Sequence, residues 1–184
     1  MSNAKNSFDL SIQEAESILG FYDELNKDKL RSKELEVLKR AGLIVALTAW
    51  ETYVEDRIEE SVKKLLSGIS NAPAAKFMAL KLSDELKRFH TPNSDKTKKL
   101  FLDYLGIDVH KSWIWNNFEQ SKVKAKLDEL VSKRGEAAHR AKNEELGNVK
   151  PDLIKIDELR KSVTFLKKLV EETDKILESD ANLT

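Results

Sequence analysis

The sequence predicts an all-α protein, a helical bundle of four main helices with an inserted helical segment. Only six glycines and three prolines occur in 184 residues, so long stretches are free of helix breakers. Apolar residues recur at spacings of three and four almost throughout, which is the period of a helix with one buried face. Charged residues make up 35% of the chain and balance to zero net charge, which argues against disorder.

The first two helices are expected in the N-terminal part of the chain. Residues 1–7 are expected to be a disordered lead, and Ser11 with Glu14 forms a capping-box pattern that predicts a helix start at Ser11. A second helix is predicted from Ser32 to about Gly68. At about 1.5 Å per residue it would be about 50 Å long, so it must be the spine of the bundle or an element of a dimer. Gly42 either bends this helix or permits a close crossing.

The inserted segment is expected between the second main helix and the third. A helix is predicted from Pro73 to about His90, because proline suits a first helical turn. Its apolar positions are Phe77, Leu80, Leu86 and Phe89. A turn at 91–94 and a shorter helix over 95–105, ended by Gly106, follow. Residues 107–118 carry aromatic side chains without a clean period and predict an irregular connector, with Trp113 and Trp115 in the core rather than stacked on bases.

Two further helices are predicted over 118–143 and 157–177, separated by a loop that Gly147 and Pro151 mark. The pattern indicates one helical domain over residues 8–178, followed by a flexible tail at 179–184.

Composition excludes several classes of function. The chain has no cysteine, which rules out disulfides and thiolate metal sites and fits a cytoplasmic protein. Neither an HExxH pattern nor a carboxylate–histidine cluster is present, so neither a metal nor a cofactor is expected. No apolar run is long enough to span a membrane. There is no global basic excess, so any binding of nucleic acid must rest on a local patch or on a second subunit.

The stretch RGEAAH, residues 134–139, holds the strongest candidates for chemistry. Arg134 can hold a phosphate with a bidentate fork and a permanent charge, and His139 can move a proton near neutral pH. A metal-independent ribonuclease needs both proton transfer and a cation at the phosphate. An acid–base group must act on the ribose 2′-hydroxyl and the leaving oxygen, and a cation must stabilise the charge that grows on the phosphoryl group.

The spacing of Arg134 and His139 does not place them on one face of a helix. Five residues rotate by about 500°, so the two side chains diverge by about 140° and lie about 7.5 Å apart along the axis. Three arrangements would bring them together: the arginine curls towards the histidine, Gly135 loosens the turn, or two copies of the helix meet across a symmetric interface. By itself the pair is equally compatible with a salt-bridged arginine and a half-buried histidine.

Two segments resemble the HEPN domain superfamily. LDELVSKRGEAAH, residues 127–139, resembles the motif helix of HEPN domains, in which an arginine is followed after four to six residues by a histidine. The segment LIVALTAWETYVE, residues 43–55, resembles the second helix of the RiboL-PSP and MAE_28990-like HEPN groups, which carry a Trp-Glu-x-Tyr-Val-Glu motif. The sequence departs from the motif at Gly135, where a polar residue is usual.

The resemblance implies a homodimer in which the arginines and histidines of both subunits line a cleft. It implies a metal-independent endoribonuclease of a toxin–antitoxin, defence or RNA-processing system, with RNA as substrate and an antitoxin or nucleotidyltransferase as partner. His139 would be the acid–base group and Arg134 the phosphate clamp. The alternatives are a non-catalytic HEPN-like module that binds RNA, nucleotide or a partner protein, and a purely structural bundle.

Several other residues are candidates for a functional role, each with a structural alternative. Glu51 joins the catalytic set by resemblance, orienting Arg134 or His139, and is weighed equally against an exposed acidic patch. Glu55, one turn away, is expected to belong to such a patch. Arg140, Lys133 and Lys142 are the candidate RNA-binding residues, although lysines at this density are also typical of a solvated face. The aromatic residues Trp50 and Tyr53 are expected in the core or a dimer interface, and His90 and His110 at the surface.

Overall fold

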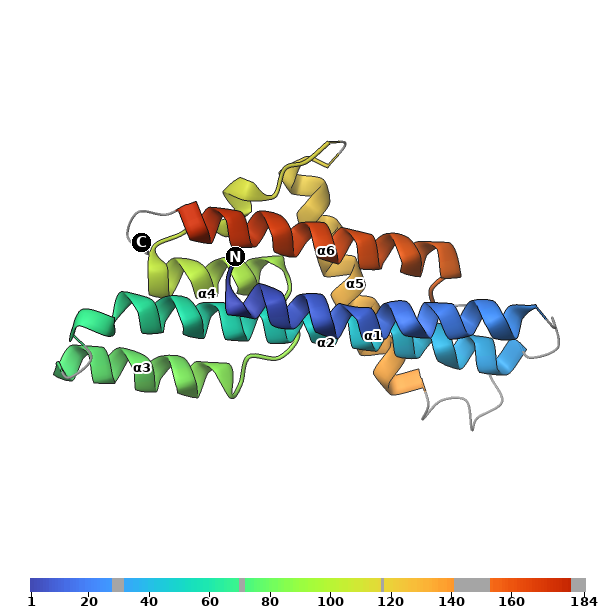
Figure 1. The fold of residues 1–184 in the computed structure, drawn as a ribbon, viewed down its shortest axis with the longest axis horizontal. Helices are drawn as coiled ribbons and strands as arrows, with labels where there is room; N and C mark the ends of the chain where they lie inside the picture. Colours follow the sequence, from blue (N-terminus) through green and yellow to red (C-terminus); the bar gives the residue numbers. More distant parts are fainter. Residues whose placement is uncertain (28–31, 70–71, 117, 141–152, 180–184) are drawn as a thin grey trace.

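The protein is an all-α bundle in a computed structural model that describes residues 1–27, 32–69, 72–116, 118–140 and 153–179 (Figure 1). The helices are α1 (Asn3–Asn26), α2 (Ser32–Leu65), α3 (Pro73–Leu86), α4 (Ser94–Leu105), α5 (Gln120–Arg140) and α6 (Ile156–Ser179). Two short 3₁₀ helices, η1 (Ser67–Ile69) and η2 (Val109–Ser112), complete the described elements. No strand occurs in these ranges, so the predicted fold class is confirmed.

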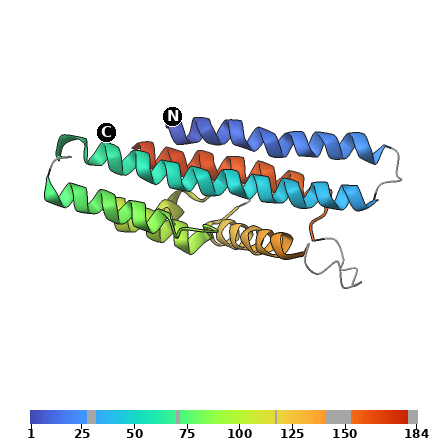
Figure 2. The ribbon, with the colours of Figure 1, turned by 90° about the horizontal axis from the view of Figure 1, so that it is seen from below.

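The helix α2 is the spine of the molecule, as its length predicts. It contacts α1, α3, α4, α5 and α6. The helices α1, α2 and α6 run along the long axis, while α5 crosses them at a steep angle (Figure 1). Seen from below, α3, α4 and α5 lie on the side of α2 opposite α1 (Figure 2). The inserted segment therefore shares a face of the spine with α5, the helix that carries Arg134.

The core is built around aromatic side chains whose polar atoms are satisfied. Trp50, Tyr53 and Trp113 are among the largest fully buried residues. The indole Nε1 of Trp50 donates to the carbonyl of Pro92 at 2.9 Å, and that of Trp113 donates to Thr173 Oγ1 at 2.9 Å. Buried tryptophans keep their packing contribution only when the N–H finds such a partner. The core placement of Trp50, Tyr53 and Trp113 is confirmed.

Gly42 permits a close crossing of helices. A Cβ at this position would lie 3.0 Å from Leu159 Cδ2 on α6 and 3.5 Å from Ile18 Cγ2 on α1. The helix α2 continues through the position. The absence of a side chain therefore lets three helices meet at one level of the bundle.

The expected disordered lead is wrong, because α1 begins at Asn3. Ser2 is its N-cap and accepts from the Lys5 amide at 3.0 Å. Ser11, the predicted start, lies inside the helix and donates its hydroxyl to the Ser7 carbonyl. The physical reason is burial: the stripe that α1 packs on the bundle starts well before Ser11. Its buried residues are Ala4, Phe8, Ile12 and Ala15.

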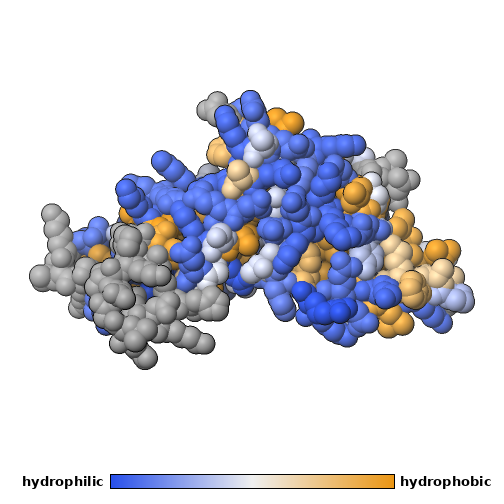
Figure 3. All heavy atoms as spheres, turned by 180° about the vertical axis from the view of Figure 1, so that it is seen from behind, coloured by the Kyte–Doolittle hydropathy of each residue, from blue (hydrophilic) through white to orange (hydrophobic). Residues whose placement is uncertain are grey.

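The inserted helix α3 also differs from its prediction. It ends at Leu86, and its buried residues are Ala75 and Leu82. Phe77 and Leu80, expected in the stripe, are 63% and 68% exposed. Contact with α2 selects the face with the small residue, and the larger apolar side chains stay at the surface. Hydrophobic surface is visible at the end of the molecule that holds η1 and α3 (Figure 3).

The remaining boundaries follow the sequence prediction closely. The helix α4 ends at Gly106, which adopts a φ of 72° as a left-handed cap. The connector after it contains η2 and a single bridge between Trp115 and Phe118. The predicted end of α5 at 141–143, the loop at Gly147 and Pro151, and the tail at 180–184 lie outside the described residues. Among the helices that are described, none has the length and hydropathy needed to cross a membrane.

A buried polar cluster joins the N-terminus to α2 and α6. Arg57, 3% exposed, donates from Nε to Asp174 Oδ1 at 2.9 Å and from Nη2 to Glu178 Oε1 at 3.0 Å. Its Nη1 donates to the hydroxyl of Ser61, and Ser2 donates to Asp174. A buried charge needs such partners to offset the loss of water. The cluster therefore stabilises the fold only while it remains complete.

Candidate functional site

Arg134 lies on the face of α5 that packs on the bundle. The buried residues of this helix fall at heptad-like spacing: Val123, Leu127, Leu130 and Ala137. Arg134 occupies the position of this stripe between Leu130 and Ala137, and its side chain is 22% exposed. A permanently charged guanidinium in a core-facing stripe requires an anionic partner, because it cannot deprotonate.

Glu51 on α2 is that partner. Arg134 Nη2 lies 2.9 Å from Glu51 Oε2, and the Glu51 side chain is 13% exposed. The second oxygen, Glu51 Oε1, accepts from the backbone N–H of Thr91 at 3.0 Å. One carboxylate therefore joins α2, α5 and the turn before α4. The structure brings Glu51 and Arg134 together, two of the three residues that the resemblance placed in one set.

The turn at 91–94 is held from several sides. Thr91 has a φ of 55°, which is strained for a β-branched residue. Trp50 binds the Pro92 carbonyl, and Asn93 caps α4 by accepting from the Lys96 amide at 2.9 Å. Asp128 on α5 accepts from the Ser94 N–H at 2.8 Å and from its hydroxyl at 2.9 Å. Sequence reasoning missed Asp128 and Thr91, since the arginine–histidine signature starts at Arg134 and assigns no role to either residue.

His139 lies in the last turn of α5, but its side chain is outside the described residues. The same holds for the side chain of Arg140, and Lys142 lies beyond the helix in the undescribed range. The helix is continuous through Gly135, and no atom of another element lies within 4 Å of a Cβ built there. Of the three arrangements considered, a turn loosened at Gly135 is not observed, and the angular divergence of an ordinary helix remains.

Lys133 has carboxylate partners within the chain. Its Nζ lies 2.7 Å from Glu129 Oε1 on α5 and 2.5 Å from Glu158 Oε1 on α6. Burial lowers the pKa of Lys133, but the hydrogen bonds to the two carboxylates outweigh it and raise the pKa above its usual value. The ammonium is thus positioned to tie α5 to α6.

The two remaining histidines differ from each other. His90 is exposed, as expected. The surface position expected for His110 is wrong, because its side chain is 2% exposed and its Nε2 lies 3.0 Å from the Ser94 carbonyl. Burial lowers the pKa of His110 below its usual value. Its ring stacks near Trp113, with centroids 4.4 Å apart, so it is part of the core under α4.

No group of three or more histidine and carboxylate side chains that could hold a metal occurs in the described parts of the chain. The site can bind an anion through the Arg134 guanidinium, which the Glu51 carboxylate holds in place. Arginine presents five N–H donors in a fixed fork, and the bond to Glu51 engages one nitrogen. The other donors remain suited to a phosphate oxygen.

Glu55 is half-buried on the next turn of α2. Burial and then the neighbouring carboxylates of Glu51, Asp56 and Glu59 raise its pKa from 4.5 to about 7. Its position is therefore less exposed than the acidic patch expected from the sequence.

Replacing Glu55 by glutamine is expected to stabilise the protein at alkaline pH and to have no effect in acid. The folded protein binds this proton more tightly than the unfolded chain, so stability falls as pH rises from about 4.5 to about 7 and stays reduced above that. Glu55→Gln removes the penalty, about 1 kcal/mol near pH 8 once solvent screening is allowed for. Urea unfolding at several pH values measures it. The exposed Glu14→Gln variant on α1 is the control, and an equal gain for both variants at every pH would contradict the assignment.

No curated protein and no solved structure matches the chain significantly. Residues 9–179 match the model of the RiboL-PSP-HEPN family. This match covers α2 with its Trp50-Glu51 segment, the inserted helices, and α5 with Arg134 and His139. The chain therefore belongs to the RiboL-PSP-HEPN family.

Proposed function

We propose that the protein is a metal-independent endoribonuclease of HEPN type. His139 serves as the general acid–base group and Arg134 as the clamp on the scissile phosphate, leaving a 2′,3′-cyclic phosphate on the product. Glu51 orients the guanidinium of Arg134. HEPN domains are commonly ribonucleases, and the family match supports this class of activity.

The observation that carries the proposal is the Arg134–Glu51 ion pair. The arginine of the family motif is held at 2.9 Å by the glutamate of the second family motif, and that glutamate is itself fixed by the Thr91 amide. A rigid, partly water-excluded cation is the arrangement that stabilises developing negative charge with little reorganisation. Two motifs 83 positions apart in the sequence thus meet at one point.

We propose further that the site is completed across a homodimer. Five helical residues separate Arg134 from His139 by about 140°, so one helix does not present both groups to one phosphate. A two-fold interface between α5 helices would double both groups and place them in one cleft. Arg140 and Lys142 would contact the RNA backbone. Lys133 would do so by exchanging Glu158 or Glu129 for a phosphate.

Cleavage of total RNA in EDTA tests the proposal. The wild-type protein is expected to cleave without added metal, and Arg134→Ala to lose about 10²–10³-fold in rate. Arg134→Lys keeps the charge without the fork and is expected to recover only part of the loss. Light scattering on the same samples reports whether the active species is a dimer. If wild type and variants are equally inert while RNA still binds, the enzyme assignment fails.

A non-catalytic module is the second candidate, favoured by two observations. Arg134 is already paired with a carboxylate in the single chain, and Gly135 stands where family members usually carry a polar residue. In this case the same face would bind RNA, nucleotide or a partner protein without cleaving. An antitoxin or a nucleotidyltransferase is the partner class that either function implies.

A further inference from the structure

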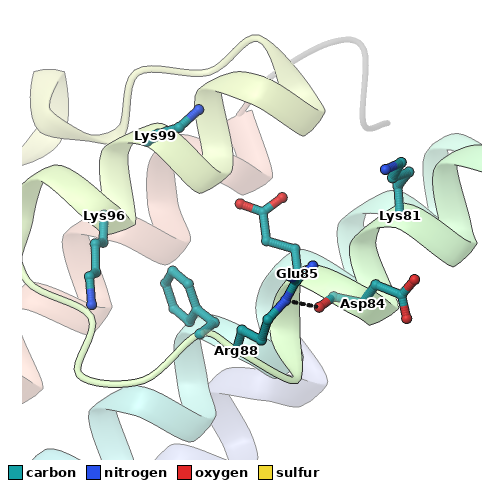
Figure 4. Close-up of a pocket in the computed structure, with 7 residues that line it drawn as sticks. Lys81, Asp84, Glu85, Arg88, Lys96 and Lys99 are labelled. Carbon is teal, nitrogen blue, oxygen red and sulfur yellow. Dashed lines mark hydrogen bonds between the residues drawn. The ribbon is translucent and has the colours of Figure 1, made fainter.

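A basic cleft lies between α3 and α4, on the same side of α2 as the Arg134 site. Its volume is about 450 Å³. Its lining consists of Lys81, Asp84, Glu85, Arg88, Phe89, Lys96 and Lys99. The close-up shows that these side chains come from the end of α3, the segment after it, and the first turns of α4 (Figure 4). The connection between the two helices bounds the cleft on one side (Figure 4).

The cleft is cationic although the whole chain is neutral. Four cationic side chains line it against two carboxylates, and one of the four, Lys99, is ion-paired with Asp103 on α4. Both carboxylates are already engaged: Asp84 accepts from Lys87 at 3.0 Å, and Glu85 accepts from the Tyr104 hydroxyl at 2.9 Å. A concave site with an excess of positive charge concentrates anions near its surface.

Two of the cations retain free donors. Arg88 donates from Nε to the Asp84 carbonyl at 3.3 Å, which leaves both Nη groups without an acceptor in the described chain. Lys81 Nζ lies 5.8 Å from the Phe77 ring centroid and forms no ion pair in the described part of the chain, although its charge acts on Asp84. An arginine with a free fork is suited to a phosphate, and an unpaired lysine adds a point charge.

A single peptide group connects the cleft to the Arg134 site. The carbonyl of His90 accepts from Lys96 Nζ at 2.8 Å, and the N–H of the same peptide, on Thr91, donates to Glu51 Oε1 at 3.0 Å. A planar peptide holds its O and N only about 2 Å apart, so Lys96 Nζ lies within about 8 Å of the Glu51 carboxylate. Glu51 in turn holds Arg134. The two cationic groups are therefore separated by a few nucleotides of a single strand at most.

We infer that the cleft between α3 and α4 binds the phosphate backbone of single-stranded RNA on one side of the phosphate held by Arg134. This rests on the proposed function, which it extends from one phosphate to a strand. Arg88 and Lys96 contact consecutive phosphates, and Lys81 adds long-range attraction. The contact is independent of base sequence in so far as these cations bind phosphates, because phosphate contacts carry no sequence information.

Binding of a fluorescent single-stranded RNA of mixed sequence tests the inference. All variants carry His139→Ala, so the RNA stays intact during the measurement. Adding Arg88→Gln and Lys96→Gln is expected to raise the Kd at least about tenfold at moderate salt. The slope of log Kd against log salt should fall by about 1.4, since each phosphate contact on a single strand contributes about 0.7.

Lys167→Gln with Lys175→Gln is the matched control. It makes the same change in net charge on α6, where both lysines are in exposed ion pairs. We expect less than about a twofold effect on Kd. All four positions are surface residues, so circular dichroism should show an unchanged fold.

The outcomes separate the inference from the proposed function. If the cleft variant binds RNA as tightly as its parent while the wild-type protein cleaves RNA, the inference fails and the ribonuclease survives. If the wild-type protein neither binds nor cleaves RNA, the proposed function is wrong, and the inference that rests on it is wrong as well. If poly-glutamate binds tightly and the cleft variant loses this binding while RNA binding is unchanged, the cleft is a site for an acidic protein and the inference is overturned.

Discussion

RNA cleavage in EDTA is expected to fall by about 10²–10⁴-fold when His139 is replaced by alanine, the usual contribution of a positioned acid–base group. No other side chain in the proposed set can shuttle a proton in the neutral range, because Arg134 stays charged. Initial rates on a fluorescent RNA measure the loss, and the cyclic phosphate on the product end identifies the reaction. His90→Ala is the control, since this histidine is exposed and lies on the turn before α4. Equal activity of His139→Ala and wild type would exclude the assigned role.

Mixing the His139→Ala and Arg134→Ala proteins tests the composite site. If Arg134 of one subunit works with His139 of its partner, a mixed dimer keeps one intact pair. Random exchange makes half of the dimers mixed, so activity should return to about a quarter of the wild-type rate. A site confined to one chain would show no recovery, which would remove the dimer from the mechanism while leaving the residues in place.

Replacing Arg57 by methionine is expected to destabilise the protein by about 3–5 kcal/mol. The substitution leaves Asp174, whose side chain is 5% exposed, as a buried carboxylate without its cationic partner. Urea unfolding at neutral pH measures the effect. Lys63→Met, an exposed change on the same helix, is the control and should cost less than about 0.5 kcal/mol.

The double variant Arg57→Met with Asp174→Asn shows where the cost comes from. Asparagine carries no charge and can still accept from Ser2, which binds Asp174 in the native protein. We expect the double variant to recover more than half of the stability lost by Arg57→Met. If it is less stable than the single variant, the loss comes from packing of the arginine stem rather than from the stranded charge.

Local patterns predicted most of the helices, because helical periodicity depends on residues only three and four positions apart. The boundaries of α2, α4 and α6 follow from apolar spacing, from Gly106 and from the loops between them. The start of α1 could not be predicted in this way. Its capping-box pattern at Ser11 is a local signal, and burial of Ala4 and Phe8 against the bundle overrides it.

The prediction of which face of α3 is buried was wrong for the same reason. Phe77 and Leu80 have the right spacing for a buried stripe, but spacing does not say which face finds a partner. His110 was misplaced because its position near a loop says nothing of the Trp113 ring and the Ser94 carbonyl that surround it. The α3 error concerns a contact with another helix, and the His110 error concerns both a neighbouring ring and a carbonyl 16 positions away.

The sequence alone determined the all-α class, the long spine and the two motifs that carry the family resemblance. These depend on local periodicity and on residues within one helix. The resemblance offered Glu51 as a partner of Arg134 or His139 against an exposed acidic patch, and the tertiary structure decided for Arg134. Only the tertiary structure showed that one peptide at Thr91 connects this pair to a basic cleft. Such contacts depend on where α5 and the inserted segment cross α2. That crossing is set by packing and by buried charge that must find a partner, and no local pattern records it.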